Sequence, residues 1–157
     1  MSRTHHQNSS IQSTEPDIAR PKKVILIVED QDDIRQLIKI SLASTQHTIH
    51  EASDCQTALN MARALKPDLM LLDVMLPAGS DTELEGLSCG LSVCRLLKSD
   101  PQFAATYIIL LTSKGQAADV KAGLAAGANA YMVKPFGVAN LIEVVQRQLA
   151  TEPSHGQ

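Results

Sequence analysis

The chain has 157 residues, of which 44% are hydrophobic and only 3% aromatic, so it is long enough for one globular domain with a mainly aliphatic core. Its formal net charge of −3 provides no basic surface for nucleic acid, and we expect no direct contact with DNA or RNA. No apolar run approaches the roughly 18 residues of a membrane span, and the polar start MSRTHHQNSS lacks the apolar centre of a signal peptide. These features predict a cytoplasmic protein without membrane contact.

We expect a polar tail over residues 1–21, one folded domain over residues 22–150 and a second short tail over residues 151–157. The first tail is rich in Ser, Thr and Gln, a composition that buries too little apolar surface to fold. Its neighbouring His5 and His6 therefore indicate a mobile tail and not a metal site.

Two short apolar runs end in carboxylates. The first, VILIVED, spans Val24 to Asp30, and the second, LMLLD, spans Leu69 to Asp73. Runs without polar alternation are typical of parallel strands covered by helices on both faces. Because ligands of such sheets bind at the carboxyl ends of the strands, Glu29, Asp30 and Asp73 converge on one pocket if the two strands are neighbours. Three like charges repel one another unless a cation joins them, which predicts a divalent metal ion.

Between the strands, apolar residues recur at the three- and four-residue spacing of helices that cover a sheet. A further strand is predicted near Thr48 to Ala52, after which Asp54 is placed to cap the second helix and Pro67 to end it. The apolar positions that define the helices are Ile34, Leu37, Ile38 and Leu42, then Ala58, Met61, Ala62 and Leu65, then Leu91 to Leu97, and finally Val138, Leu141, Ile142, Val145 and Leu149.

Two later apolar runs end in groups that suit an anion. YIILLTS, Tyr107 to Ser113, ends in hydroxyls, and ANAYMVKPF, Ala128 to Phe136, contains Lys134 just before Pro135. Repeated strand–helix units require right-handed crossovers and hence a parallel sheet. We therefore expect an α/β fold with a five-stranded parallel sheet in the flavodoxin-like order 2-1-3-4-5 and helices on both faces.

At this point the chain resembles the response-regulator receiver family, the phospho-accepting modules of bacterial two-component signalling. The resemblance covers roughly Lys22 to Leu149 and rests on four motifs. They are ED at Glu29-Asp30, LLDVMLP at Leu71 to Pro77, LLTS at Leu110 to Ser113, and KPF at Lys134 to Phe136. It implies a signalling switch that takes phosphate from a histidine kinase or histidine phosphotransfer protein and acts by binding an unknown downstream protein or a second copy of itself.

The resemblance also assigns the chemistry to individual residues. Asp73 would be the phospho-acceptor, and Thr112 and Lys134 would hold the phosphoryl oxygens. A receiver of this kind promotes its own phosphorylation and dephosphorylation and is not otherwise an enzyme.

The expected cofactor is Mg²⁺, which prefers oxygen ligands and retains several waters. Asp30, Asp73 and the backbone carbonyl of Met75 would be direct ligands, and Glu29 would contribute through water. The family often has Asp where Glu29 stands, so the distance from its longer side chain to the metal is an open question.

The resemblance implies switching through Thr112 and Tyr131, the residue whose aromatic ring turns inward on activation. The fourth helix, about Gln116 to Ala126, contains Gly123, which costs roughly 1 kcal/mol relative to Ala, and is followed by Gly127 as a C-terminal cap. Two explanations of Gly123 stay open. It marks either a segment of low stability that moves in switching, or close packing against Tyr131 or the sheet.

The segment after Asp73 is longer than the resemblance implies. Receivers commonly carry a Gly about eight positions beyond the phospho-acceptor, and the matching Gly90 lies 17 positions beyond it, so about nine residues within Ala78 to Cys89 are additional. They include three acidic residues and no basic one. The insertion is either a tolerated surface loop or an acidic selectivity element beside the site.

An alternative function is a small Asp-nucleophile phosphatase or hydrolase, as in haloacid-dehalogenase-like enzymes. Those enzymes need a second Asp two residues after the nucleophile as acid and base, and here Met75 occupies that position. A dinucleotide-binding module is weaker still, because no Gly-rich turn follows Val28.

Cys55, Cys89 and Cys94 are odd in number and lack a CxxC spacing, which argues against both a disulfide framework and a zinc site. We expect reduced thiols, with Cys94 packed on a helix.

Overall fold

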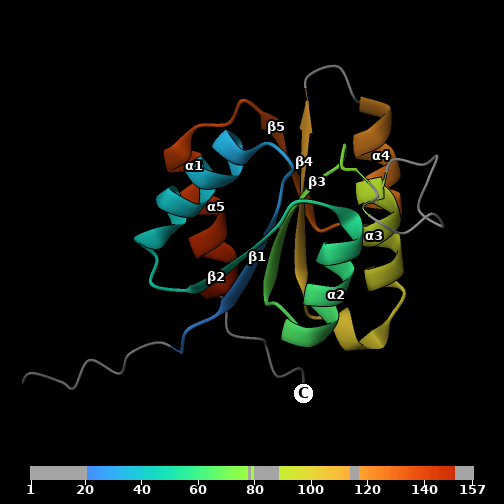
Figure 1. Cartoon of the computed structure of the whole chain (residues 1–157), viewed down its shortest axis with the longest axis horizontal. Coiled ribbons are helices and arrows are strands. Elements are labelled where there is room, and N and C mark those ends of the chain that lie inside the picture. The colour runs from blue at the N-terminus through green and yellow to red at the C-terminus, as the bar shows by residue number, and fades with distance from the viewer. Residues whose placement is uncertain (1–20, 78, 80–88, 114–116, 151–157) are drawn as a thin grey trace, which may run out of the picture.

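The computed structural model describes residues 21–77, 79, 89–113 and 117–150, in which five strands and five α-helices alternate (Figure 1). The strands are β1 Val24–Val28, β2 Thr48–Ala52, β3 Leu69–Asp73, β4 Tyr107–Ser113 and β5 Ala130–Lys134. The helices are α1 Asp32–Ala43, α2 Cys55–Leu65, α3 Cys89–Lys98, α4 Ala117–Ala125 and α5 Val138–Ala150, with the 3-10 turn η2 Pro101–Phe103 after α3. The two predicted tails, apart from Pro21, and most of the predicted insertion lie outside the described residues.

All five strands run parallel in the order β2-β1-β3-β4-β5, which confirms the expected fold. Val28 at the end of β1 pairs with Leu72 of β3, and Asp73 at the end of β3 pairs with Leu111 of β4. The carboxyl ends of the strands therefore meet along one edge of the sheet, the upper edge in Figure 1.

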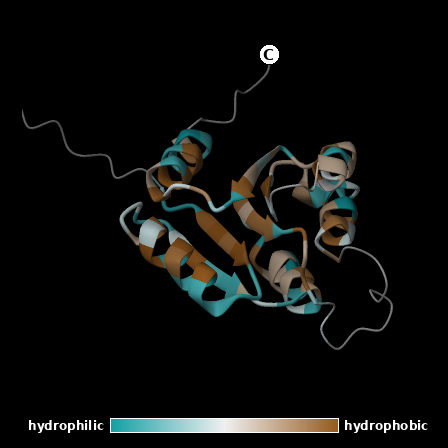
Figure 2. Ribbon diagram, turned by 90° about the horizontal axis from the view of Figure 1, so that it is seen from above, coloured by the Kyte–Doolittle hydropathy of each residue, from teal (hydrophilic) through white to brown (hydrophobic). Residues whose placement is uncertain are grey.

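The sheet lies between two helical layers, with α1 and α5 on one face and α2, α3 and α4 on the other (Figure 1). Side chains of β1 alternate between the two cores, since Ile25 and Ile27 pack toward α1 and α5 while Leu26 and Val28 pack toward α2 and α3. Seen from above, the apolar strands lie in the middle of the molecule (Figure 2). Burial on both faces, worth about 1.5–3 kcal/mol for each fully buried aliphatic side chain, explains why these strands show no polar alternation.

Helix α1 shows where periodicity alone misjudges a buried face. Ile38 and Leu42 are fully buried as predicted, and Ile34 packs on the core. Leu37, which belongs to the same predicted stripe, is 48% exposed, and Ile40 is 71% exposed. The prediction for Leu37 is wrong because α1 contacts the sheet along a narrower stripe than the sequence pattern indicates.

The structure explains Gly123 by close packing against the sheet. A Cβ at this position would lie 2.0 Å from Cδ1 of Leu110 in β4 and 3.2 Å from Cδ2 of Leu91 in α3. Only Gly lets α4 approach the sheet this closely. Gly127 has a φ of +105° just after α4, which confirms it at the C-terminal end of this helix.

Cys55 and Cys89 are joined by a disulfide, so the expectation of reduced thiols is wrong for this pair. Cys55 is the first residue of α2 and Cys89 the first of α3, and their Cα atoms are 6.2 Å apart. The two positions are 34 residues apart in sequence and meet only because both helices start at the same edge of the sheet. Cys94 is buried in α3 with a free thiol, as predicted.

Within the described ranges, no helix is both long and apolar enough to cross a membrane.

Candidate functional site

The carboxylates of Glu29, Asp30 and Asp73 meet at the carboxyl edge of the sheet, with one oxygen of each within 4.8 Å of the others. Glu29 and Asp30 directly follow β1, and Asp73 ends the neighbouring β3. Glu29 is fully buried and Asp73 is 4% exposed, whereas Asp30 lies at the surface. The predicted convergence of the three residues is confirmed, and hard oxygen donors of this kind suit Mg²⁺.

Lys134 inserts its ammonium group between two of these carboxylates. Its Nζ donates to Oε2 of Glu29 at 2.6 Å and to Oδ2 of Asp73 at 2.9 Å. The side chain of Lys134 is only 15% exposed, so the pairs are shielded from solvent. One ammonium thus faces three carboxylates, which leaves an excess of negative charge in the cluster.

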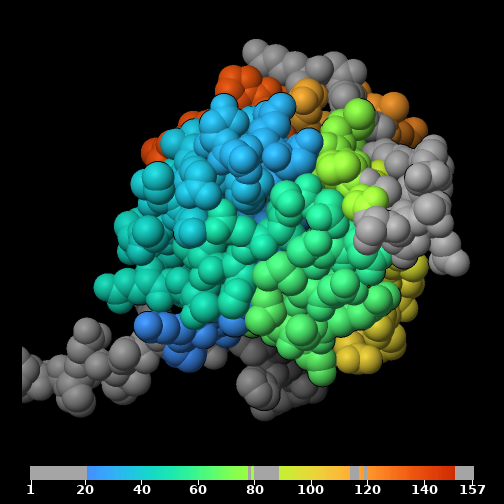
Figure 3. Space-filling model, in the orientation of Figure 1, coloured from blue at the N-terminus to red at the C-terminus, as the bar shows by residue number. Residues whose placement is uncertain are grey.

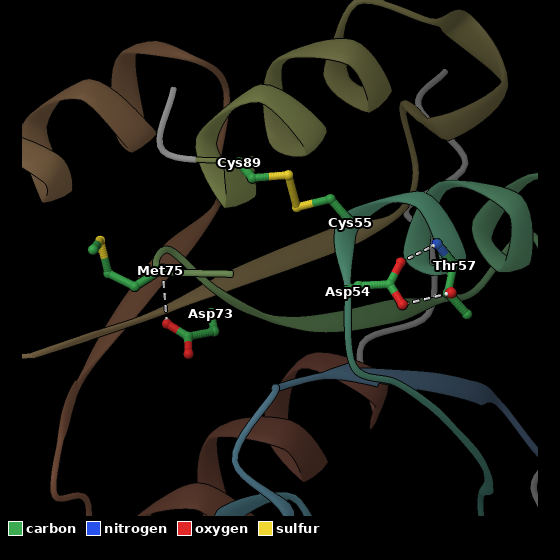
Figure 4. The surroundings of a disulfide bond; sticks show 6 residues. All are labelled: Asp54, Cys55, Thr57, Asp73, Met75 and Cys89. Atoms are coloured by element: carbon green, nitrogen blue, oxygen red, sulfur yellow. Dashed lines mark hydrogen bonds between the residues drawn. A yellow bond between two sulfur atoms is a disulfide. The ribbon is translucent and has the colours of Figure 1, made fainter. Parts of the chain in front are cut away.

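The backbone after β3 is bent toward the Asp73 side chain. The amide of Met75 donates to Oδ1 of Asp73 at 3.0 Å (Figure 4). The amide of Val74 donates to the carbonyl of Leu111 at 3.0 Å. The Met75 side chain is 57% exposed and points away from the carboxylate. The backbone of Met75, whose carbonyl is the predicted metal ligand, therefore borders the cluster.

Burial dominates the electrostatics of Glu29. The pKa of this carboxyl is raised to about 7, chiefly by burial and also by the nearby charge of Asp73, while Lys134 and the hydrogen bond from the Gln31 amide oppose the rise. Burial by itself would lower the pKa of Lys134, but its hydrogen bonds to Glu29 and Asp73 outweigh that effect and raise it. The cluster is therefore short of positive charge, and a divalent cation would supply it.

Arg35 is a neighbour of the site that sequence reasoning missed. Its Nη1 donates to the backbone carbonyl of Glu29 at 2.8 Å, and its guanidinium also pairs with Asp32 and with Glu51 of β2. An Arg six residues after the carboxylate gives no recognisable motif, so only the geometry of α1 brings it there. Space-filling atoms place the start of α1 beside the segment that follows β3 (Figure 3).

The two predicted switch residues lie on the neighbouring strands. Thr112 is 2% exposed and follows Leu111, the register partner of Asp73, and its hydroxyl donates to the Ser113 carbonyl at 3.4 Å. Tyr131 is 48% exposed and pairs with Leu110. Thr112 is therefore buried near Asp73, whereas the Tyr131 ring reaches solvent.

Gly90 packs directly against the backbone of Asp73. A Cβ on Gly90 would lie 2.1 Å from the carbonyl oxygen of Asp73, and the Gly90 amide donates to the Val74 carbonyl at 3.3 Å. This close approach explains why glycine stands at the position that matches the receiver pattern. Residues 78 and 80–88 of the predicted insertion lie outside the described part of the chain.

Chemically, the site combines a buried carboxylate, a fixed ammonium and an acidic cluster suited to Mg²⁺. This set can bind a phosphoryl group, which needs mainly positioning and charge neutralisation. The position two residues after Asp73 carries the exposed, apolar Met75, which cannot act as the acid and base that a hydrolase would require.

Comparison with known proteins shows which family has this combination of fold and acidic residues. Residues 25–146 match the family described as the response regulator receiver domain. The chain is 36% identical over 136 residues to the alkaline phosphatase synthesis transcriptional regulatory protein SphR of Synechococcus elongatus, covering 81% of this chain and 49% of that protein. It is 39% identical over 111 residues to the transcriptional regulatory protein AfsQ1 of Streptomyces coelicolor, covering 71% and 44%. The chain thus spans about half the length of the curated relatives it matches.

Solved structures agree in fold. A putative response regulator from Chloroflexus aurantiacus superimposes with a TM-score of 0.71 at 28% identity, covering 83% of this chain and all of that one. The chemotaxis response regulator CheY4 of Vibrio cholerae gives a TM-score of 0.69 at 26% identity, covering 82% and 99%. With the acidic cluster, the parallel sheet and the sequence match in agreement, this chain belongs to the response regulator receiver domain family of two-component systems.

Proposed function

We propose that the domain is a phospho-accepting switch in which Asp73 takes a phosphoryl group from the phosphohistidine of a histidine kinase or histidine phosphotransfer protein. The observation that carries the proposal is the environment of the Asp73 carboxylate. One oxygen accepts from Lys134 at 2.9 Å and the other from the Met75 amide at 3.0 Å, inside a cluster of acidic residues. A carboxylate whose two oxygens are both held by hydrogen bonds supports this proposal, because phosphoryl transfer depends mainly on positioning.

In the proposed step, a carboxylate oxygen of Asp73 attacks phosphorus, the P–N bond to the donor imidazole breaks, and an acyl phosphate forms on Asp73. Mg²⁺, held by Asp30, Asp73 and the Met75 carbonyl with Glu29 acting through water, would offset the charge of the incoming phosphoryl group. Water attack on the same phosphorus would return the domain to its starting state, so the protein would promote its own dephosphorylation.

Lys134 and Thr112 would bind the transferred group. Lys134 already contacts Asp73, so its ammonium needs to move little to reach a phosphoryl oxygen, and its second pair with Glu29 would keep it in place. Thr112, buried beside the Asp73 register partner, would donate its hydroxyl to another phosphoryl oxygen. These two contacts would compensate charge that the carboxylates alone would repel.

The test is labelling with acetyl phosphate and Mg²⁺, read by intact-protein mass. We expect wild type to gain one base-labile phosphoryl group and Asp73→Asn to gain none. Asp68→Asn is the matched control, because it removes one charge from the opposite end of the same strand while keeping an acceptor for the Val24 amide, and it should be labelled like wild type. Full labelling of Asp73→Asn would reject the assignment.

We further propose that phosphorylation draws Thr112 toward Asp73 and lets Tyr131 follow, which alters the surface of α4, β5 and α5 for a downstream protein or a second copy of the chain. The Tyr131 side chain is half exposed, so an inward movement would bury it and change this surface. Hydrogen exchange of α4 and β5 with and without beryllofluoride, a phosphoryl mimic, tests the coupling. Unchanged exchange in both elements would contradict it.

The place of action and the direct targets are proposals too. We propose action in the cytoplasm, where a histidine kinase presents its phosphate, and output through protein contact and not through DNA contact by this domain. The curated relatives described as transcriptional regulators are about twice as long as the matched region, so that description belongs to those proteins. Retention of the phosphorylated domain on a DNA column at physiological salt would contradict the second point.

A further inference from the structure

The Cys55–Cys89 disulfide adjoins the phosphate site. Cys89 immediately precedes Gly90, which packs on the Asp73 carbonyl and donates to the Val74 carbonyl. The Cys55 and Cys89 side chains are drawn above the backbone that carries Asp73 and Met75 (Figure 4). The bond therefore fixes the start of α3 at the point where α3 contacts the phospho-acceptor strand.

The other end of the insertion is also held at the start of α2. The Cys55 amide donates to the Pro77 carbonyl at 3.1 Å, and a Cβ on Gly79 would lie 2.6 Å from Oδ1 of Asp54. Asp54 is itself held, because it caps α2 through the Thr57 amide. Both ends of the segment between Pro77 and Cys89 are thus attached at the start of α2, one by a hydrogen bond and the other by the disulfide.

We propose that Cys55 and Cys89 form a reversible thiol–disulfide pair that controls how firmly the Asp73–Pro77 segment is held, and hence the affinity of the site for Mg²⁺ and its rate of phosphate uptake. The last part rests on the proposed function. In the cytoplasm, the location proposed above, disulfides are usually transient, and there a bond at this position would act as a sensor of oxidising conditions. The oxidised form is the one with the preorganised site.

Cys55 and Cys89 each occupy the first position of a helix. The Asp54 carboxylate caps α2 and opposes a negative charge on Cys55, whereas the first turn of α3 has no acidic residue, so Cys89 is the better placed of the two to form a thiolate. Amide groups at a helix N-terminus stabilise the negative charge of a thiolate, which is the reactive form. Both residues are buried, so exchange requires a local opening of the α3 start.

The oxidant is a low-molecular-weight disulfide. One protein thiolate attacks it and releases one small thiolate, leaving a mixed disulfide on the protein. The second protein thiolate then attacks the protein-bound sulfur, forms the Cys55–Cys89 bond and releases the second small thiolate. Two protein thiols are oxidised, one small disulfide is reduced, and the two protons lost by the protein end on the two released thiols. A dithiol reductant reverses the sequence.

Cys94 provides an internal control in the same helix. Burial raises the pKa of its thiol, against the opposing effects of Lys98 and Arg95. It is buried and unbridged, so it remains a protonated thiol.

The first experiment counts thiols. The full chain is equilibrated with glutathione disulfide or with dithiothreitol, denatured, alkylated with iodoacetamide and weighed by mass spectrometry. The chain contains three cysteines, so we expect three labels on the reduced protein and one on the oxidised protein. Cys94→Ala should give two and none. Three labels on oxidised wild type would overturn the proposal.

The second experiment measures Mg²⁺ affinity of the oxidised and reduced forms by titration calorimetry with magnesium chloride. We expect at least about fivefold tighter binding by the oxidised form, the lower end of typical coupling between sites. Cys94→Ala should keep this ratio, and Cys89→Ala should bring it to one. The wild-type comparison decides the matter without any variant, and equal affinities in the two forms would overturn the coupling.

Labelling of both forms with acetyl phosphate separates the two proposals. Faster uptake by the oxidised form supports both. If both forms are phosphorylated on Asp73 at the same rate, the redox coupling of uptake is wrong and the proposed function stands. If neither form is phosphorylated, the proposed function fails, while the thiol count and the Mg²⁺ titration still decide whether the pair is redox-active and linked to the site.

Discussion

Polar side chains at the two edges of the sheet differ in how far their charge is compensated by partners. At the amino edge, two side chains each accept a hydrogen bond from a backbone amide. Asp68 accepts from the Val24 amide at 2.8 Å, and Nδ1 of His47 accepts from the Lys23 amide at 3.1 Å. These bonds join the starts of β1, β2 and β3.

At the carboxyl edge, the cluster of three carboxylates contains one ammonium, that of Lys134, which pairs with the two buried carboxylates, Glu29 and Asp73. Buried charges lower the stability of the folded state unless they are paired, so we expect a bound cation to stabilise this edge. The comparison teaches that the candidate site lies at the edge where the negative charge of the carboxylates is not fully compensated. At the other edge, the hydrogen bonds between side chains and backbone serve to hold the strands together.

Removing the ammonium of Lys134 should give the largest loss of stability. Lys134→Met leaves Glu29 and Asp73 without their cationic partner, and we expect a loss of about 3 kcal/mol in the free energy of unfolding in the absence of Mg²⁺. Lys39→Met is the matched control, since its exposed pair with Glu51 has a similar length of 2.8 Å and should cost less than about 1 kcal/mol. Urea unfolding measures both, and equal losses would contradict the distinction.

A methyl group at Gly90 should separate α3 from β3. Gly90→Ala places a Cβ against the Asp73 carbonyl, and we expect a destabilisation of about 2–3 kcal/mol together with weaker Mg²⁺ binding. Gly137→Ala serves as control because a Cβ there meets nothing within 4 Å, so it should cost less than about 1 kcal/mol. Thermal unfolding with and without Mg²⁺ distinguishes the two. A Gly90→Ala protein as stable as wild type would show that α3 can shift without strain.

Neutralising one carboxylate at each edge should give effects of opposite sign. Asp30→Asn relieves repulsion in the cluster, so in the absence of Mg²⁺ it should raise the unfolding midpoint, while Mg²⁺ affinity falls at least about tenfold. Asp68→Asn should leave Mg²⁺ affinity unchanged and should not raise the midpoint. Calorimetry and thermal scans test both variants, and an unchanged Mg²⁺ affinity in Asp30→Asn would move the metal elsewhere.

The smallest expected effect is a pH dependence at the amino edge. Burial lowers the pKa of His47 below its ordinary value of 6.5, with Asp68 opposing the shift and Lys23 adding to it. The stability that His47 contributes is therefore complete above pH 6.5 and is lost as the pH falls below that value toward its folded-state pKa. The stability difference between wild type and His47→Asn should shrink from pH 8 to pH 5. A difference that grows instead would reverse the sign of the shift.

The fold could be predicted from the sequence because its strands are unbroken aliphatic runs, and β2, β3 and β4 have the expected bounds. Helical periodicity is less informative. Leu37 fits the apolar stripe of α1 and is half exposed, since the spacing does not tell how wide a stripe the sheet can cover. Gly123 allowed two explanations, and only the distance to Leu110 favours packing.

For the candidate site, strand ends were sufficient to bring the three carboxylates together. The direct pair between Glu29 and Lys134 was not predicted, because 105 residues separate them and no local pattern relates the two. The disulfide was missed for the same reason, and because an odd number of cysteines with no paired spacing argues against one. The order of the strands predicts which strand ends meet, whereas these two side-chain pairings depend on details of packing that no sequence pattern carries.

The attachment of both ends of the insertion at α2 has a consequence for redesign. The Cα atoms of Cys55 and Cys89 are 6.2 Å apart, and Pro77 is hydrogen-bonded to Cys55, so the two stems of residues 78–88 are adjacent whatever lies between them. The intervening segment can be exchanged for one of another length at little entropic cost. This receiver therefore offers a natural graft point, where a foreign recognition loop could be placed next to Asp73, the proposed phospho-acceptor, without disturbing the sheet that carries it.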